Sequence, residues 1–514
     1  MRRFLQNAVS ILNGDEEFLR EHLAVPASGI GIYRDSIRKR GETVVTMARS
    51  DEGRCLLLLA PSRTDLFDAF EGEIVCDDVG IAAKQCPLST ENAAALRGVF
   101  PWTAPVPVLR KKCSIGCGDR LGLATAAHAK VFKRFEAYPV FAQQSVRELT
   151  LTDRSFRSVI DDASFLVYQA GFEYGFAADG DHLKTLEQIR TALETGVTML
   201  TLDLSEKLRP EFSEKTGTEL LQAFQSLPNS LRKRLKETYE KRTFHFGDTA
   251  IVFSAEELMR CAVIYSAALD FAAEAGQMLK TFGDGSTDLE ISIDETTAPT
   301  LPEHHFFAAN ELQVRGVDFV SLAPRFIGEF QKGIDYIGDL EEFKKQLRVH
   351  AAIAEQFGFY KLSIHSGSDK FKTFPFIGDF TKGRFHLKTA GTSYLEAVRT
   401  IANADPALFR EMWRTALNSL DAALKLYHIT ADFSKLPDLE QISNYELPSL
   451  LKDDTARQLL HITYGAMLGS NSPLRLRIRA TLHRYENIYE ELLIKHFEKH
   501  LTLLHVPHRS RGKH

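Results

Sequence analysis

Between residues 111 and 389, short apolar runs alternate with longer segments whose apolar residues recur every three to four positions. Short runs of this kind are typical of buried strands, and the longer periodic segments are typical of amphipathic helices. The runs lie at residues 111–118, 138–144, 172–179, 196–203, 288–294, 317–323, 360–365 and 384–389. Strand and helix repeated eight times predict an α/β fold whose parallel strands close into a (β/α)8 TIM-like barrel. The alternative is an open doubly wound sheet, but the chain has no GxGxxG turn to support it.

Further regions flank and interrupt this repeat. Residues 1–108 predict an N-terminal α+β region that ends in the proline-rich segment "PWTAPVPVL", and the barrel itself is expected over residues 109–400. Residues 204–286, after the fourth strand, predict a helical insertion at the face where barrel enzymes bind substrates, so they are a candidate lid or wall. Residues 401–514 predict a C-terminal helical extension that packs on the barrel or on a neighbouring subunit, which leaves a homo-oligomer open.

The overall composition excludes several classes of protein. The 514 residues carry a net charge of −5 and give a pI of about 6.4, which provides no basic surface for nucleic acid or an anionic membrane. No apolar run approaches the roughly 20 residues that a membrane span needs. Acidic residues interrupt the N-terminal apolar stretch before it reaches signal-peptide length. The six cysteines form no CxxC pair, as is usual in the reducing cytosol. We therefore expect a cytoplasmic protein that binds neither nucleic acid nor membranes.

Charged and polar residues recur where the expected strands end. In a (β/α)8 barrel these ends meet at one face, which holds the active site of barrel enzymes. Each end taken alone is compatible with a helix cap or a solvated turn, but so many charges at one rim need partners, and a cation and a polar substrate would supply them. The residues that we expect to bind substrate there are Asp119, Arg120, Gln143, Lys184, Asp203, Arg325 and Lys388.

Three histidines come from different expected strands: His182, His365 and His386. Neutral imidazole is a common ligand of zinc, nickel and similar ions, and three protein ligands with open positions suit a catalytic metal site. We therefore expect one divalent cation, which could be zinc, nickel, cobalt, manganese or iron. Each histidine taken alone could instead be a hydrogen-bonded core residue or a general acid.

Two carboxylates at the same face are candidates for acid and base chemistry. Asp181 follows the third apolar run, and Glu295 follows Asp294 at the end of the fifth. Two carboxyl groups can hold different protonation states when burial and a nearby cation shift their pKa values apart. Either residue could alternatively be a metal ligand.

Several long segments resemble one protein family. They are "GCGDRLGLATAAH", "FAQQSVREL", "GFAADGDHLKT", "SIDETTAPTLPEHHFFAANEL", "GVDFVSLAPRFIGEFQKGIDYIGDLEEF" and "FHLKTAGTSYLEAVR", and they extend from about residue 113 to beyond residue 400. Together they resemble the bacterial tagaturonate/fructuronate epimerases of hexuronate breakdown. The resemblance implies a metal-dependent isomerase that inverts one hydroxyl-bearing carbon of a keto sugar acid. It places the site at Asp181, His182, Glu295, His365 and His386.

The two substrates implied by this resemblance differ at the carbon β to the ketone, whose hydrogen the carbonyl does not acidify. We therefore expect retro-aldol cleavage and re-addition, with one of Asp181 and Glu295 as the base, the other as the acid, and a cation polarising the ketone. Arg325 or Lys388 would bind the substrate carboxylate. Transient oxidation is the alternative route. Alternative functions are a metal-dependent sugar-acid aldolase or isomerase, and a non-catalytic sugar-acid binding protein.

Overall fold

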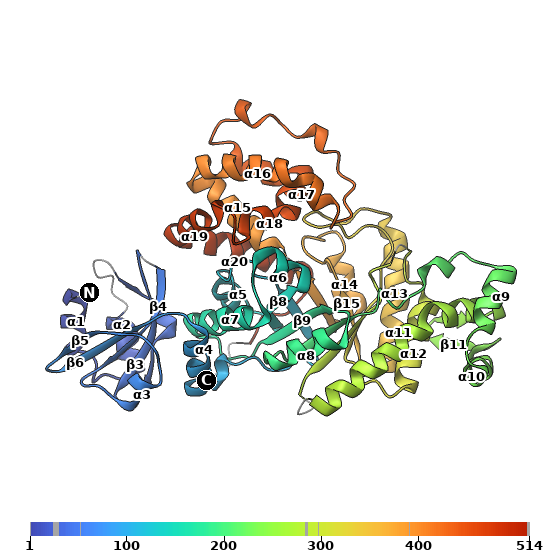
Figure 1. The fold of residues 1–514 in the computed structure, drawn as a ribbon, viewed down its shortest axis with the longest axis horizontal. Helices are drawn as coiled ribbons and strands as arrows, with labels where there is room; N and C mark the ends of the chain where they lie inside the picture. Colours follow the sequence, from blue (N-terminus) through green and yellow to red (C-terminus); the bar gives the residue numbers. More distant parts are fainter. Residues whose placement is uncertain are drawn as a thin grey trace.

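The computed structural model describes residues 2–23, 30–51, 53–282, 286–296, 298–389 and 391–510. Eight parallel strands form a closed barrel at its centre, so the expected α/β barrel is confirmed (Figure 1). In chain order and around the barrel, the strands are β7 (Cys113–Cys117), β8 (Tyr138–Ser145), β9 (Ala177–Leu183), β10 (Met199–Asp203), β13 (Asp288–Ser292), β14 (Ser321–Ala323), β15 (Lys361–Ile364) and β16 (Phe385–Thr389). Each of the eight predicted runs overlaps one of these strands.

Strand β9 continues four residues beyond its expected end at residue 179. Its polar residues Asp179 and Asp181 are two positions apart, so both point to the same side of the strand, and both contact Lys388 on β16. The polar segment is therefore part of the barrel interior and not a turn beyond it. The ammonium group of Lys388 stabilises these two acids at positions where apolar side chains would be expected.

Helices surround the barrel and bury their apolar faces against the strands. They include α5 (Thr125–Phe132), α6 (Val146–Thr152), α7 (Phe156–Ala170), α8 (Leu186–Glu194), α12 (Pro302–Val314), α13 (Leu340–Phe357) and α14 (Phe374–Phe380). Side chains such as Phe132, Val167 and Leu347 are fully buried in this layer. Each buried residue of this size contributes about 1.5–3 kcal/mol relative to an exposed position, which makes the barrel a rigid support for the face that follows.

The N-terminal residues form an antiparallel sheet beside the barrel, at the left of Figure 1. Its strands are β1 (Gly31–Ile32), β2 (Arg38–Arg40), β3 (Thr43–Ser50), β4 (Gly53–Ala60), β5 (Glu73–Asp78) and β6 (Ile81–Cys86), with helices α1 (Arg2–Val9), α2 (Glu16–His22), α3 (Asp65–Asp68) and α4 (Thr90–Val99). One face of the sheet packs against α1 and α2, and the other packs against α4 and the barrel helix α7. Tyr168 of α7 donates a hydrogen bond to the Val45 carbonyl, which fixes the sheet to the barrel.

The C-terminal residues form a helical unit with a hydrophobic core of its own. It comprises α15 (Thr392–Ala404), α16 (Pro406–Leu424), α17 (Asp454–Ile462), α18 (Tyr464–Leu468), α19 (Leu474–Arg484) and α20 (Glu486–Leu503). Figure 1 shows most of these helices above the barrel, while α20 reaches down to pack against α5. Among the helices described, none combines the length and the apolar character that crossing a membrane requires.

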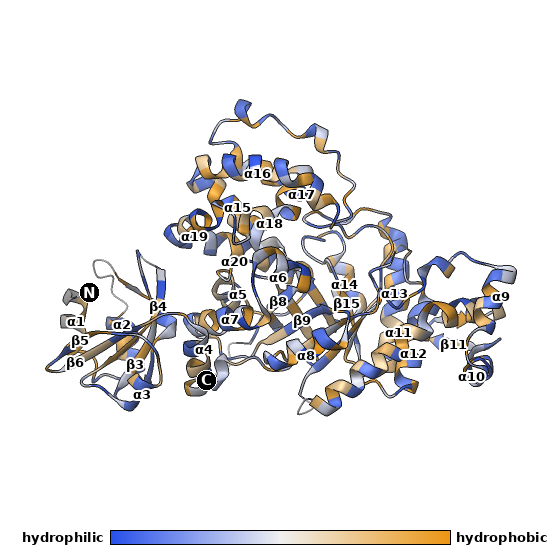
Figure 2. Ribbon diagram, viewed as in Figure 1, coloured by the Kyte–Doolittle hydropathy of each residue, from blue (hydrophilic) through white to orange (hydrophobic). Residues whose placement is uncertain are grey.

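The insertion after β10 lies on the outer flank of the barrel, at the right of Figure 1. It holds α9 (Gly217–Gln225), α10 (Asn229–Tyr239), α11 (Ala255–Phe282) and an unexpected hairpin of β11 (Thr243–Phe246) and β12 (Thr249–Val252). Helix α10 is mostly blue in Figure 2, in keeping with its polar outer surface. Its Arg234 and Tyr239 both contact the buried Glu311 of α12, at 2.6 and 2.8 Å. The insertion is thus fixed to an outer helix.

Glu486 at the start of α20 joins the N-terminal sheet to the C-terminal unit. Its carboxylate accepts hydrogen bonds from Arg54 (2.7 Å), Arg49 (2.8 Å) and the hydroxyl of Tyr33 (2.8 Å). Burial alone would raise the pKa of Glu486, but these donors lower it to about 2. Because the pKa is lower in the folded state, the contribution to stability is complete above the unfolded value near 4.5 and is lost as the pH falls toward 2.

We expect Glu486→Gln to lower the free energy of unfolding by about 3 kcal/mol at pH 7, because it leaves buried Arg54 without its counter-charge. The deficit relative to the unsubstituted protein should shrink as the pH falls toward 2. Urea denaturation across this pH range measures both effects. Glu498→Gln on the same helix removes a more exposed pair with Arg134 and should cost less than about 1 kcal/mol. Equal losses in the two variants would contradict the prediction.

Candidate active site

A cavity of about 270 Å³ lies at the carboxyl ends of the barrel strands. A second cavity of about 210 Å³ shares several of its lining residues and extends it. Of the expected site residues, Asp181, His182, Glu295, His365, Arg120, Gln143, Lys184, Asp203 and Lys388 line the first cavity, and Arg325 lines the second. Asp119 and His386 line neither. No described residue of the insertion at 204–286 lines either cavity, so its expected role as a lid or wall stays a prediction.

The floor of the cavity is a buried ammonium group among carboxylates. Lys388 Nζ lies 2.9 Å from Asp179, 2.7 Å from Asp181 and 3.1 Å from Glu290, and its side chain is only 4% exposed. Burial disfavours the charged lysine, but the three carboxylates raise its pKa well above the ordinary value. Burial raises the pKa of Asp179 to about 7, with added repulsion from the other two acids. One ammonium cannot balance this group, so the floor retains excess negative charge.

His182 lies directly above these acids and is held in one orientation. Its φ of 58° is in the left-handed region, which costs a non-glycine residue about 1–3 kcal/mol and persists where the surroundings impose it. The Nδ1–H group donates to Asp181 Oδ1 at 2.7 Å. Burial alone would raise the pKa of Asp181, but Lys388 and His182 hold it well below its usual range, so this carboxylate stays ionised. The Nε2 atom of His182 is left to face the cavity.

His365, at the end of β15, is oriented in the same way. Its Nε2–H group donates to Glu290 Oε1 at 2.8 Å, and its Nδ1 atom lies 3.1 Å from Asp294 Oδ1. Burial disfavours the charged imidazole, but Asp294 and Glu290 raise its pKa to about 10. The two imidazole rings lie 5.0 Å apart between centroids. Both rings are therefore in a field that favours positive charge.

His182, His365 and Asp294 offer ligand atoms that all lie within 4.8 Å of one another; we call them the ligand cluster. Histidine ligands of metals usually donate their second ring N–H to a carboxylate, which fixes the tautomer and the ring orientation. Here Asp181 accepts the hydrogen bond from His182, and Glu290 accepts the one from His365. Two imidazoles and one carboxylate with open positions suit a transition-metal ion. The residues present therefore fit a divalent cation.

His386 is not part of this cluster, which departs from the ligand set expected from the sequence. It lies opposite Ser363 in the barrel, two residues before Lys388 on the same strand and thus about 7 Å deeper. Its Nδ1 atom contacts Ser114 Oγ at 2.9 Å, and burial lowers its pKa to about 3. His386 is therefore a neutral residue of the barrel interior. Among the described residues, Asp294 and not His386 offers a ligand atom within 4.8 Å of those of His182 and His365.

Three other residues that were expected to bind substrate make contacts within the protein. Asp119 accepts hydrogen bonds from backbone N–H groups of its own loop, including Ala124 at 2.7 Å, and so stabilises the loop after β7. Arg325 donates to the carbonyl of Thr296 and lies at the second cavity. Lys388 is enclosed by acids. Gln143 does fit a substrate contact, because among described groups its buried amide has no hydrogen-bond partner.

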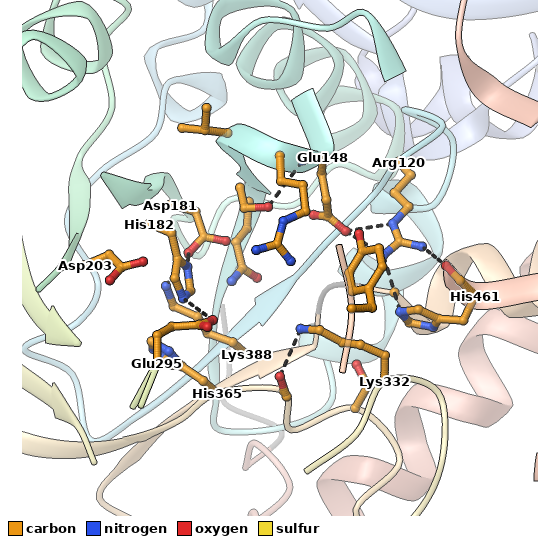
Figure 3. A pocket seen from close by; sticks show the side chains of 18 of the residues that line it. Arg120, Glu148, Asp181, His182, Asp203, Glu295, Lys332, His365, Lys388 and His461 are labelled. Atoms are coloured by element: carbon orange, nitrogen blue, oxygen red, sulfur yellow. Dashed lines mark hydrogen bonds and ion pairs between the residues drawn. The ribbon is translucent and has the colours of Figure 1, made fainter. Parts of the chain in front are cut away.

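The wall opposite the ligand cluster comes partly from the C-terminal unit, and the sequence did not indicate this (Figure 3). Arg120 pairs with Glu148 at 2.6 Å and donates to the carbonyl of His461 at 3.2 Å. Its guanidinium also lies 3.6 Å from the ring centre of Tyr464. His461 approaches the barrel so closely that a side chain at Gly391 would lie 1.9 Å from its ring. The extension therefore closes one side of the cavity.

Glu295 projects into the cavity beside the ligand cluster. Its side chain is half exposed, and its Oε1 atom lies 3.9 Å from His182 Nε2. Glu295 is not among the residues whose ligand atoms all lie within 4.8 Å of one another. A solvent-accessible carboxylate next to a cation site can take a proton from a bound hydroxyl group. The geometry therefore favours the acid–base role of Glu295 over the ligand role.

Two other groups of histidines and acids lie outside the cavity. In the first, His304 contacts Glu257 at 2.9 Å and Tyr265 at 3.2 Å, which occupies both ring nitrogens. In the second, Asp369 contacts His496 at 2.8 Å and Arg457 at 2.5 Å. Both groups connect helices to their neighbours through these contacts.

The chain is similar to known proteins over most of its length. A profile of the family described as tagaturonate epimerase matches residues 33–504. The curated tagaturonate/fructuronate epimerase of Thermotoga maritima is 40% identical over 482 residues, which cover 93% of this chain and 97% of that protein. The native crystal structure of fructuronate-tagaturonate epimerase UxaE from Cohnella laeviribosi superposes with a TM-score of 0.89 at 44% identity, covering 93% of this chain and 97% of that one. Its complex with one glycerol gives the same values.

Proposed function

The chain belongs to the tagaturonate/fructuronate epimerase family of isomerases, and we propose that its cavity interconverts D-tagaturonate and D-fructuronate with a divalent cation held by His182, His365 and Asp294. The proposal of a cation rests on the orientation of the two imidazole rings. In each ring a carboxylate holds one nitrogen, and the other nitrogen is turned toward Asp294 or the cavity. The two-nitrogen, one-oxygen donor set suits zinc, nickel, cobalt, manganese or iron.

The position of the inverted carbon limits the chemistry. Tagaturonate and fructuronate differ at C4, which is β to the C2 ketone, so the carbonyl does not acidify the C4 hydrogen. A β-hydroxy ketone can instead lose its hydroxyl proton and break the C3–C4 bond, with the electron pair passing to the ketone. This gives the enediolate of dihydroxyacetone and a three-carbon aldehyde acid. Rotation of the aldehyde and re-addition invert C4. When bound, the cation supplies Lewis acidity to the ketone oxygen.

The protein side chains supply the remaining functions. We assign to Glu295 both the removal of the C4 hydroxyl proton and its return to the C4 alkoxide that forms on re-addition, because Glu295 is accessible and lies beside the ligand cluster. Asp181 and Glu290 position the two histidines. This replaces the acid–base role expected for Asp181, whose carboxylate is engaged by Lys388 and His182 and is a weak base. Gln143 is available to hydrogen-bond a substrate hydroxyl group. Enclosure by the C-terminal wall keeps the two fragments together and limits access of water.

Rapid-quench experiments with C4-deuterated tagaturonate test the route. During a single turnover, we expect dihydroxyacetone and the aldehyde acid to be trapped by borohydride in amounts below one equivalent of enzyme. The fructuronate formed should keep its deuterium, because the C4–H bond is never broken. The same quench without enzyme controls for cleavage in the alkaline quench solution. Loss of deuterium to water, or complete turnover without any trapped fragment, would contradict retro-aldol cleavage and favour proton abstraction or transient oxidation.

A further inference from the structure

Most cations that line the cavity already face a carboxylate. Lys388 is enclosed by three acids in the barrel interior. Arg120 pairs with Glu148 at 2.6 Å, and both side chains are almost fully buried. Lys184 lies 3.6 Å from Asp203. A substrate carboxylate at any of these groups would have to compete with an anion that belongs to the protein.

Lys332 is different, because no described carboxylate lies within ion-pair distance of its ammonium group. Nζ donates to the hydroxyl of Ser366 at 2.9 Å, and Ser366 directly follows His365 of the ligand cluster. Lys332 also lines both cavities. Arg147 likewise has no carboxylate partner among the described residues, but it is exposed and lies over the ring of Tyr427 at 5.2 Å. Solvent screens an exposed charge far more than a charge at the cavity wall.

The backbone around Lys332 is fixed on both sides. The buried ammonium of Lys370 donates to the carbonyl of Gln331 at 2.9 Å. Arg457, from the C-terminal unit, donates to the carbonyl of Gly333 at 2.7 Å. An ordinary surface lysine would not require the backbone on both sides of it to be fixed by hydrogen bonds. The loop therefore presents the Lys332 side chain from a preorganised position, which reduces the entropic cost of binding an anion.

We infer that Lys332 binds the carboxylate of the sugar-acid substrate, with the hydroxyl of Ser366 as a second donor. In Figure 3, Lys332 lies across the cavity from His182 and Glu295, so a substrate that spans the cavity would meet the ligand cluster at its ketone end and Lys332 at its acid end. This inference rests on the proposed function, since it takes the substrate to be a keto uronate. It replaces the expectation that Arg325 or Lys388 holds the carboxylate.

The substitution Lys332→Met tests the inference through binding and turnover together. We expect KM for tagaturonate to rise about 100-fold while kcat falls less than about threefold, because a charge-assisted contact remote from the reacting bond is lost. The inhibition constant of the hexonate made by reducing the ketone should rise by a similar factor. Lys332→Arg keeps the positive charge and should restore most of the hexonate affinity. Lys345→Met removes an exposed lysine of α13 and should leave every constant within about threefold of the unsubstituted enzyme.

Several results would overturn the assignment. KM and the hexonate inhibition constant could stay within about threefold of the unsubstituted values in Lys332→Met, or the loss could fall on kcat alone. Equal losses in Lys332→Arg and Lys332→Met would also exclude a role for the charge. These outcomes are distinct from failure of the proposed function, which would show as no conversion of tagaturonate by the unsubstituted, cation-loaded enzyme.

Discussion

Replacing Asp294 with asparagine is expected to lower kcat/KM for tagaturonate about a thousandfold, equivalent to about 4 kcal/mol of transition-state stabilisation. Asparagine has nearly the same shape but no negative charge, so the cluster loses its anionic ligand while the two histidines keep their carboxylate partners. The bound cation should fall below one equivalent for the same reason. Steady-state kinetics and elemental analysis of the purified protein measure the two effects.

Removal of the cation should reproduce this loss in the unsubstituted enzyme. Dialysis against EDTA is expected to abolish turnover, and adding back a divalent cation should restore it. Asp270→Asn, at an exposed aspartate paired with Arg315, is the matched control and should change neither turnover nor cation content. His386→Gln should retain the cation, because His386 lies below the cluster. A variant set in which His386→Gln loses the cation and Asp294→Asn keeps it would show that the cluster has been wrongly identified.

Glu295→Gln is expected to lower kcat by about 10²- to 10³-fold while the enzyme keeps a full equivalent of cation. The amide preserves the size of the side chain but cannot accept the hydroxyl proton of the substrate. KM should change less than about threefold, because the group acts mainly as the bond breaks. Single-turnover kinetics together with elemental analysis separate this role from that of a metal ligand.

A matched control and a rescue experiment distinguish a catalytic base from a residue that only supports the structure. Glu206→Gln alters an exposed glutamate near Lys184 and should leave kcat within about threefold. In Glu295→Ala, added formate should restore part of the activity, because a small carboxylate can occupy the space of the missing base. If Glu295→Gln were fully active, the base would have to be another group. If it lost the cation, Glu295 would be a ligand.

The sequence predicted the barrel well because its strands are short apolar runs separated by long periodic helices. It also predicted that Asp181, His182, Glu295 and His365 lie at one cavity, since parallel strands present their ends at the same face. It could not predict depth within the barrel. His386 and Lys388 are two positions apart on one strand and point to the same side, yet they lie in different layers.

The remaining site residues come from segments whose position is set by tertiary contacts. Lys332 lies on a loop held by Lys370 and Arg457, and His461 comes from a helix far along the chain. No periodicity or motif relates such positions to the barrel strands. The hairpin at residues 243–252 was missed because each of its strands is buried at only one position and so forms no apolar run. Local patterns therefore predicted the framework, while packing between distant segments determined the substrate wall.

Anomalous diffraction from crystals of the active enzyme grown with Mn²⁺ locates the cation in the barrel. We expect one dominant peak at coordination distance, about 2.0–2.3 Å, from the facing nitrogens of His182 and His365 and an oxygen of Asp294. A dominant peak at Asp369, His496 and His500 instead, or no peak in crystals that still turn over substrate, would contradict it.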